Sequence, residues 1–414
     1  MRVPGDKSIS HRALMLAALG SGRSRIRGLL CSADLESTAA VLRALGAIIP
    51  PLSDAEVVVE GLGLRGLRAP AADLDCGNSG TSTRLLAGIV AGAGADARFI
   101  GDASLSARPM RRVARPLEAM GAQVELAAHG GLPMTVRGGP LRGLTWHSEV
   151  ASAQVKSAIL LAGLVADVPV EVHEPAATRD HTERMLRARG ADIRTDGLAV
   201  SFVPGARLDA ADTDVPGDPS SAAFFAGLAA LGASEPLTIE AISVNPLRIG
   251  ALRVLRRMGA RVTYGASEDQ GGESVASVTV GPSALRGVTI TADEIPSLID
   301  ELPLLACVAA RAEGETRVTG AEELRVKESD RIRAIVANLQ ALGADAEELP
   351  DGLVVRGSDR PLRGTVRTHA DHRIAMAFGV LGAVAGNDVT VDDPSCASVS
   401  YPTFWDDLAR HRQR

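Results

Sequence analysis

Aromatic side chains are scarce in this chain, where Phe, Trp and Tyr together make up 2% of the 414 residues. That is too few to build the stacking platforms on which proteins bind nucleobases. The formal net charge is −6 at pH 7, so the molecule also lacks an overall basic field that would attract nucleic acid. Both absences argue against a nucleic-acid-binding protein.

Cysteine is also rare, and the four residues lie far apart with no spacing typical of a metal site: Cys31, Cys76, Cys307 and Cys396. We interpret them as free thiols in a reducing cytosol, and we predict no bound metal. No apolar run approaches the roughly 18 residues of a membrane span. The apolar run behind Arg2, Lys7 and Arg12 is similar to a signal peptide, but the same element recurs five times later in the chain.

The chain does contain a sixfold repeat, marked by six apolar runs of small residues that each read as a buried helix. They begin at Ala13, Leu85, Ala158, Ala222, Leu302 and Ile374. A short strand is expected after each run, followed by an amphipathic helix and then a hairpin. Five of the amphipathic helices end in Gly-Ala, at Gly46, Gly121, Gly190, Gly259 and Gly343, where glycine can adopt the left-handed conformation that closes a helix.

The repeat predicts an α/β (α+β) protein built from β-α-β-α-β-β units. Because 414 residues are too many for one compact domain, we expect two lobes of three units each. The N-terminal lobe would comprise residues 6–215, and the C-terminal lobe residues 216–414 together with 1–5. The sixth unit lacks its final hairpin, so we expect the N-terminal segment to supply the missing strands. That segment is short, and we also expect a stabilising extension upstream of Met1.

Polar strings precede the six apolar runs, at the point where each helix begins. Ser, Thr, Asp and Asn at such positions are usually caps, and this remains the simpler interpretation of Asp218 to Ser221. The string Gly-Asn-Ser-Gly-Thr at 77–81 could instead form a nest of backbone N–H groups for a phosphate or a carboxylate.

Cationic residues strengthen the anion-binding interpretation, since Lys7, Arg12, Arg108 and Arg373 all lie in or near these strings. The string 325–331 adds five charged residues, although a solvated surface is the usual meaning of such a run. If the cations converge, they would repel one another at about 4 kcal/mol per close pair without a ligand. We therefore expect ligands with several negative charges.

Two carboxylates, Asp300 and Glu328, accompany these cations and could serve as base and acid. The histidines His11, His181 and His372 show no metal spacing. His372 could bond a ligand or play a structural role.

Taken together, the strings resemble the 5-enolpyruvylshikimate-3-phosphate synthase family over nearly the whole chain. The matching motifs are Pro-Gly-Asp-Lys-Ser-Ile-Ser-His-Arg (4–12), Gly-Asn-Ser-Gly-Thr (77–81), Arg-Pro-Met (108–110), Ser-Ala-Gln-Val-Lys (152–156), Thr-Arg-Asp-His-Thr-Glu (178–183), Arg-Val-Lys-Glu-Ser-Asp-Arg (325–331) and Asp-His-Arg (371–373). The resemblance implies two lobes of three units, an inside-out barrel with buried helices. It also implies enolpyruvyl transfer from phosphoenolpyruvate to the 5-hydroxyl of shikimate 3-phosphate, without a cofactor, in a cytoplasmic monomer.

By position, the resemblance implies that Asp300, Glu328 and Lys7 are catalytic, Asp300 as the base and Glu328 as the acid. The residues implied for shikimate 3-phosphate are Lys7, Ser8, Arg12, Ser152, Gln154, Arg179, Asp300 and Lys327. The residues implied for phosphoenolpyruvate are Lys7, Gly80, Arg108, Gln154, Arg331 and Arg373.

Three positions depart from the commoner family pattern: Ala153, Thr178 and Val399. Two alternatives remain at this stage. One is the sister transferase that acts on UDP-N-acetylglucosamine, although this chain lacks that family's Lys-Asn motif and loop cysteine. The other is a non-catalytic anion-binding repeat protein, which the presence of both Asp300 and Glu328 disfavours.

Overall fold

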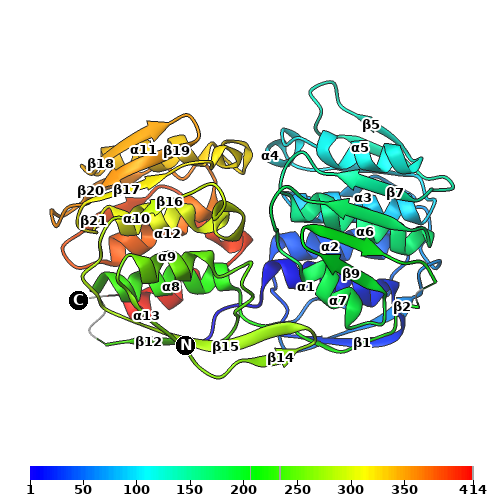
Figure 1. Ribbon diagram of the computed structural model, residues 1–414, viewed down its shortest axis with the longest axis horizontal. Helices are drawn as coiled ribbons and strands as arrows, with labels where there is room; N and C mark the ends of the chain where they lie inside the picture. The colour runs from blue at the N-terminus through cyan, green and yellow to red at the C-terminus, as the bar shows by residue number, and fades with distance from the viewer. Residues whose placement is uncertain (206, 233–234, 413–414) are drawn as a thin grey trace. The chain divides into compact units, whose positions relative to one another are not determined.

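The computed structural model of this protein describes residues 1–205, 207–232 and 235–412 (Figure 1). The chain divides into two compact units. The N-terminal unit comprises Gly5–Val215 and Gln270–Glu273, and the C-terminal unit comprises Met1–Pro4, Pro216–Asp269 and Ser274–Arg414. Relative to the expected lobes, Gly5 and the short segment Gln270–Glu273 belong to the N-terminal unit. The side chain of Glu273 lies there because it accepts a hydrogen bond at 2.6 Å from buried His181.

The N-terminal unit contains three repeats, each with its own sheet. The elements of the first are α1 (Lys7–Leu19), β1 (Ser21–Arg27), α2 (Ala33–Ala44), β2 (Val57–Leu62) and β11 (Thr213–Asp214). Those of the second are β3 (Leu74–Asp75), α3 (Gly80–Gly92), β4 (Ala97–Ile100), α4 (Ala103–Ser106), α5 (Arg111–Met120), β5 (Gln123–Leu126) and β6 (Met134–Arg137). Those of the third are β7 (Leu144–His147), α6 (Ala153–Ala166), β8 (Val170–His173), α7 (His181–Arg187), β9 (Ile193–Asp196) and β10 (Ala199–Phe202).

The C-terminal unit repeats the pattern. Its fourth repeat has α8 (Pro219–Gly232), β12 (Leu237–Ser243), α9 (Gly250–Arg257), β13 (Arg261–Tyr264), β14 (Glu268–Gln270) and β15 (Glu273–Gly281). The fifth has β16 (Thr289–Ile290), the 3-10 turns η1 (Ile295–Ser297), η2 (Ile299–Glu301) and η3 (Glu322–Val326), and α10 (Leu302–Ala309), β17 (Glu315–Val318), α11 (Arg331–Ala341), β18 (Asp345–Leu349) and β19 (Gly352–Arg356). The sixth has β20 (Arg363–Val366), α12 (His372–Ala383), β21 (Asp388–Val391), η4 (Pro394–Val399) and α13 (Phe404–His411).

The sheets confirm the predicted β-α-β-α-β-β unit. In the second, third and fifth repeats the strands lie in the order first, second, fourth, third: β3-β4-β6-β5, β7-β8-β10-β9 and β16-β17-β19-β18. The first two strands of each are parallel, because a helix connects them, and the last two form an antiparallel hairpin.

The first helix of each repeat is buried on all sides. In α6, the first helix of the third repeat, every residue from Val155 to Val165 is buried. By contrast, α5, the amphipathic helix of the second repeat, buries only one face. Helices α3 and α6 approach so closely that a Cβ atom on Gly88 would lie 2.2 Å from the carbonyl oxygen of Ala158. The buried helices therefore form the centre of each unit.

The Gly-Ala prediction is confirmed by backbone geometry, since Gly46, Gly121, Gly190, Gly259 and Gly343 all have φ between 87° and 113°.

The expectation that the N-terminal segment completes the sheet of the sixth repeat is wrong. Among the described residues, β20 pairs only with β21. The N-terminal residues do not extend that pair; instead, the backbone of Met1 bonds to Thr238 and Glu240 of β12. Within the described part of the chain, no helix is long and apolar enough to cross a membrane.

Candidate active site

The start of α1 places the first predicted cations of the N-terminal unit. Asp6 caps the helix by accepting a hydrogen bond from the backbone N–H of Ile9 at 2.9 Å. The next residue, Lys7, forms an ion pair with buried Asp34 at the start of α2. The Lys7 side chain keeps 19% of its exposure.

Arg12, one turn further along α1, is held rigidly by its neighbours. Its Nε donates to the hydroxyl of Thr182 at 2.6 Å, its Nη2 to Ser157 at 2.9 Å and its Nη1 to the carbonyl of Ser8 at 3.0 Å. The pKa of Arg12 is lowered to about 10, chiefly by burial. The nearby charges of Glu183 and Asp6 act in the opposite direction, and that of Arg179 acts in the same direction as burial. The structure thus brings Ser8, Arg12 and Arg179 together.

A second group forms where α3 and α6 begin. Ser79 caps α3 and Ser152 caps α6, each by accepting a backbone N–H of the first turn. The amide of Gln154 donates to Thr81 at 3.0 Å and accepts from Arg84 at 2.7 Å. A Cβ atom on Gly80 would lie 2.8 Å from Nη1 of Arg84 and 3.4 Å from Nη1 of Arg108. Two guanidinium groups therefore lie directly beside the first residue of α3.

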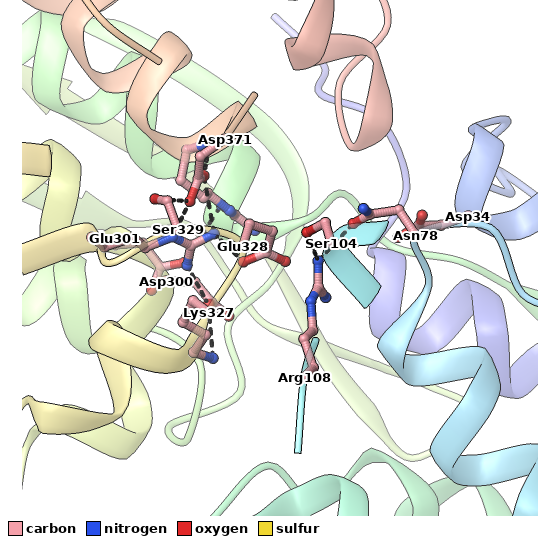
Figure 2. A network of polar contacts seen from close by, with 12 residues as sticks. Asp34, Asn78, Ser104, Arg108, Asp300, Glu301, Lys327, Glu328, Ser329 and Asp371 are labelled. Carbon is pink, nitrogen blue, oxygen red and sulfur yellow. Dashed lines mark hydrogen bonds and ion pairs between the residues drawn. The ribbon is translucent and has the colours of Figure 1, made fainter. Parts of the chain in front are cut away.

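Arg108 reaches this place from the turn after α4. Its Nη2 donates to the side-chain oxygen of Asn78 at 2.7 Å, and Figure 2 shows Arg108 extended toward Asn78 and Ser104. Arg84 was not among the predicted site residues. The repeat itself carries a signal for it, since Arg12 and Arg84 both close an eight-residue polar string that begins with glycine.

Lys156, the last residue of the third string, has no access to ligand. Its ammonium group is buried between Glu174 at 2.6 Å and Glu183 at 2.8 Å. Burial alone would lower the pKa of Lys156, but the two glutamates raise it above its usual value. Lys156 therefore forms buried ion pairs, and the pair with Glu183 links α6 to α7.

The C-terminal unit gathers its charged residues around Arg331, the first residue of α11. The guanidinium bonds to Asp371 at 2.8 and 3.2 Å, to Glu328 at 2.7 Å and to Asp300 at 3.3 Å. In Figure 2, Asp300, Lys327, Glu328 and Asp371 lie close together, and dashed lines mark their contacts. Arg331 is only 1% exposed, so the string 325–331 is not a solvated surface over its whole length.

The carboxylates set the charge state of Arg331. Burial would lower its pKa, but Asp371, Glu328 and Asp300 outweigh that effect and raise the pKa above its usual value. Asp300 also lies 3.4 Å from the ammonium group of Lys327. The two predicted catalytic carboxylates therefore share one guanidinium, although they are 28 residues apart in sequence.

Arg373 and His372 open α12, which Asp371 caps. Nη1 of Arg373 lies 3.9 Å from Glu301, and its guanidinium carbon lies 5.9 Å from the centre of the Phe224 ring. Burial raises the pKa of Glu301, while the charges of Arg248 and Arg373 act in the opposite direction.

The expected repulsion between unligated cations is wrong for several of them. Lys7, Lys327, Arg331 and Arg373 each have a carboxylate within 4 Å. Sequence reasoning missed these partners because Asp34, Glu301 and Asp371 resemble ordinary helix-start acids. Among the described residues, no cluster of His, Cys, Asp and Glu has the arrangement of a metal site.

Residues 1–408 match the EPSP synthase family, described as 3-phosphoshikimate 1-carboxyvinyltransferase. The chain is 50% identical over 405 residues to a 3-phosphoshikimate 1-carboxyvinyltransferase of Alkalilimnicola ehrlichii, covering 98% of this chain and 91% of the relative. It is 48% identical over 419 residues to the enzyme of the same description from a Synechococcus species, covering 100% of this chain and 95% of the relative.

Solved structures agree with the sequence match. EPSP synthase from Acinetobacter baumannii superposes with a TM-score of 0.87 at 42% identity, over 100% of this chain and 95% of that one. The enolpyruvyl transferase NikO from Streptomyces tendae shares the fold, with a TM-score of 0.77 at 23% identity over 99% of this chain and 94% of that one. On these matches, the chain belongs to the EPSP synthase (3-phosphoshikimate 1-carboxyvinyltransferase) family.

Proposed function

We propose that this enzyme transfers the enolpyruvyl group of phosphoenolpyruvate to the 5-hydroxyl of shikimate 3-phosphate and releases phosphate. Both substrates are anions with a phosphate and a carboxylate, and such groups match arginine and lysine side chains. The family match and the cations of both units support this reaction.

Shikimate 3-phosphate is assigned to the residues that surround Arg12 together with those that approach Asp300. They are Lys7, Ser8, Arg12, Ser152, Gln154, Arg179, Asp300 and Lys327. Arg12 supports the assignment, because hydrogen bonds to Thr182 and Ser157 hold its guanidinium in one orientation. Half-buried Ser152 would contribute its hydroxyl hydrogen, since its oxygen accepts the backbone N–H of Val155 at 3.4 Å.

Phosphoenolpyruvate is assigned to Lys7, Gly80, Arg108, Gln154, Arg331 and Arg373. The absence of a side chain on Gly80 leaves the Nη1 atoms of Arg84 and Arg108 beside the start of α3. We add Arg84 to this group, because its Nη1 donates to the side-chain oxygen Oε1 of Gln154 at 2.7 Å. The backbone N–H groups at the start of α3 and these arginines favour a bound anion.

The observation that carries the proposed mechanism is the shared contact of Asp300 and Glu328 with Arg331, at 3.3 and 2.7 Å. Two carboxylates in one cationic setting can divide the roles of base and acid. Asp300 would accept the proton of the 5-hydroxyl, with Lys327 and Lys7 stabilising the developing negative charge. Glu328 would deliver a proton to the methylene carbon of phosphoenolpyruvate, so that C2 becomes electrophilic.

The 5-oxygen then forms a bond to C2 and gives a tetrahedral intermediate that still carries the phosphate. Breaking the C2–O bond to phosphate and returning one methyl proton to Glu328 restores the double bond. The proton held on Asp300 leaves with the phosphate, so atoms and charges balance. No step of this sequence needs a redox change.

The test is phosphate release with phosphoenolpyruvate, in the presence and absence of shikimate 3-phosphate. We expect release only when both are present, with 5-enolpyruvylshikimate 3-phosphate formed in equal amount. UDP-N-acetylglucosamine should not replace shikimate 3-phosphate. Release that does not depend on shikimate 3-phosphate, or no release at all, would overturn the proposed function.

We further propose that the enzyme acts as a monomer in the cytoplasm. The four cysteines are all free thiols, and burial raises the pKa of Cys76 to about 12, so this thiol is inert. Light scattering at the assay concentration should give a mass near 42.8 kDa. A stable mass of twice that value would contradict the monomer.

A further inference from the structure

Asp371 has more hydrogen bonds than a helix cap requires. Its carboxylate is fully buried, with 0% exposure. One oxygen accepts the backbone N–H of Arg373 at 2.9 Å and Nη2 of Arg331 at 3.2 Å. The other accepts Nε of Arg331 at 2.8 Å and the hydroxyl of Ser329 at 3.0 Å. One carboxylate thus links the start of α12 to the string that contains Glu328.

The pairing with Arg331 is bidentate, and it uses one edge of the guanidinium, formed by Nε and Nη2. A planar group held along one edge has a fixed direction for its remaining N–H groups. Those groups meet Asp300 through Nη1 and Glu328 through Nη2. The pairing with Asp371 therefore fixes the orientation in which Arg331 contacts both Asp300 and Glu328.

We propose that Asp371 is a positioning residue for the reaction: it holds Arg331 in the single orientation that places Asp300 and Glu328 on one guanidinium. The inference rests on the proposed roles of Asp300 and Glu328. Asp371 acts through Arg331, and Ser329 supports it with one hydrogen bond. Without the negative charge of Asp371, the arginine would be free to turn toward either catalytic carboxylate.

The fourth repeat provides a matched control at the same position. Asp218 is also buried at the start of a buried helix, and it accepts the backbone N–H of Ser220 at 2.7 Å and Nη2 of Arg248 at 3.0 Å. It therefore combines a cap with an arginine contact, like Asp371. Neither Asp218 nor Arg248 belongs to the proposed catalytic or binding residues.

The experiment compares Asp371→Asn with Asp218→Asn. Asparagine is as good a helix cap as aspartate, so each variant removes the charge that holds the arginine and keeps the cap. We expect Asp371→Asn to lower kcat by about 10- to 10²-fold, the range typical of misplaced catalytic groups. Its affinity for shikimate 3-phosphate alone should stay within about threefold by calorimetry. Asp218→Asn should lose comparable thermal stability but keep kcat within about twofold.

A double-mutant cycle with Glu328→Gln separates positioning from general damage. If Asp371 acts through Arg331, Asp371→Asn should lower kcat by a clearly smaller factor once Glu328 is already Gln, because only the contact of Arg331 with Asp300 is then left to disturb. Full additivity of the two losses, or equal kcat losses for Asp371→Asn and Asp218→Asn, would overturn the inference.

Ser329→Ala keeps the test decisive if Asp371→Asn does not fold. This milder change removes one hydrogen bond from Asp371, and it should lower kcat about two- to fivefold in wild type and by less in the Glu328→Gln background. An unchanged kcat in Ser329→Ala would then overturn the role assigned to Asp371. Inactivity of the wild-type enzyme in the phosphate-release assay would instead count against the proposed function.

Discussion

At the residue scale, the role of Glu328 can be tested by replacing its carboxyl group with an amide of the same size. Glu328→Gln keeps the size of the side chain but removes the acid. We expect kcat to fall by about 10²–10⁴, the usual cost of losing a general acid. Binding of shikimate 3-phosphate by calorimetry should change little, because that ligand is assigned to other residues. Turnover near the wild-type value would contradict the assignment.

Gly80 allows a second residue-scale prediction. In Gly80→Ala the new Cβ atom would lie 2.8 Å from Nη1 of Arg84, so that flexible side chain must move. Because Arg84 also holds Gln154, we expect KM for phosphoenolpyruvate to rise about tenfold or more, with a smaller change for shikimate 3-phosphate. Gly139→Ala is the control, since its Cβ would meet nothing within 4 Å. Equal KM changes for both substrates would argue against this view of Gly80.

The same residues show what sequence alone could predict. The motifs predict Asp300 and Glu328 as catalytic residues, and the structure places both against Arg331, while their roles as base and acid stay a prediction. The partner Asp371 was not found, because it lies 40 residues from Arg331 and looks like a routine cap. Ion pairs between segments far apart in sequence depend on how helix starts converge, and no local pattern encodes that convergence.

At the scale of elements, α1 contains a titratable group that the reaction does not use. His11 is fully buried and its Nδ1 bonds to Thr38 at 2.7 Å. Burial, with the charges of Lys7 and Arg12, lowers the pKa of His11 well below 6.5. The unfolded chain therefore binds the proton more readily than the folded protein, and stability falls as the pH drops below about 6.5.

Replacing this histidine should flatten the acid side of the stability curve. Between pH 6.5 and 5.5, His11 should account for about 1 kcal/mol of lost unfolding free energy. His11→Asn, measured by urea unfolding at both pH values, should lose that part of the slope even if it is less stable overall. A slope unchanged in His11→Asn would contradict the prediction.

The link between α6 and α7 depends on Lys156. Lys156→Met would leave Glu174 and Glu183 buried without their cation, and losing one partner of such a group typically costs about 3–5 kcal/mol. Arg194→Ala, which breaks an exposed pair with Asp192, should cost less than about 1 kcal/mol. Urea unfolding measures both. A loss below 1 kcal/mol in Lys156→Met would show that water reaches these glutamates.

Elements were predictable where glycine or apolar periodicity set them. The five Gly-Ala helix ends and the strand that follows each buried helix could be placed from sequence, because both depend on local geometry. The partner of the N-terminal residues could not. Met1 bonds to β12 rather than to β20 and β21, and strand pairing over more than 200 residues has no local signal.

At the scale of the whole molecule, the described residues form two separate hydrophobic cores. One consists of residues between Ile9 and Val215, and the other of residues between Ala222 and Leu408. The split matches the division of the chain at Val215 and Pro216. Because each unit buries its own apolar helices, each has a source of stability that does not depend on the other core.

Two cores predict that damage to one unit stays local. Leu86→Ala and Leu305→Ala each remove a fully buried leucine, one from α3 and one from α10, at a cost of about 2–5 kcal/mol. In hydrogen exchange measured by mass spectrometry, Leu86→Ala should weaken protection in the peptides of residues 5–215 and spare those of residues 274–412. Leu305→Ala should do the reverse, and Leu198→Ala, at an exposed position, should change neither. Equal loss of protection in both ranges from either core variant would mean that the two units unfold as one cooperative structure.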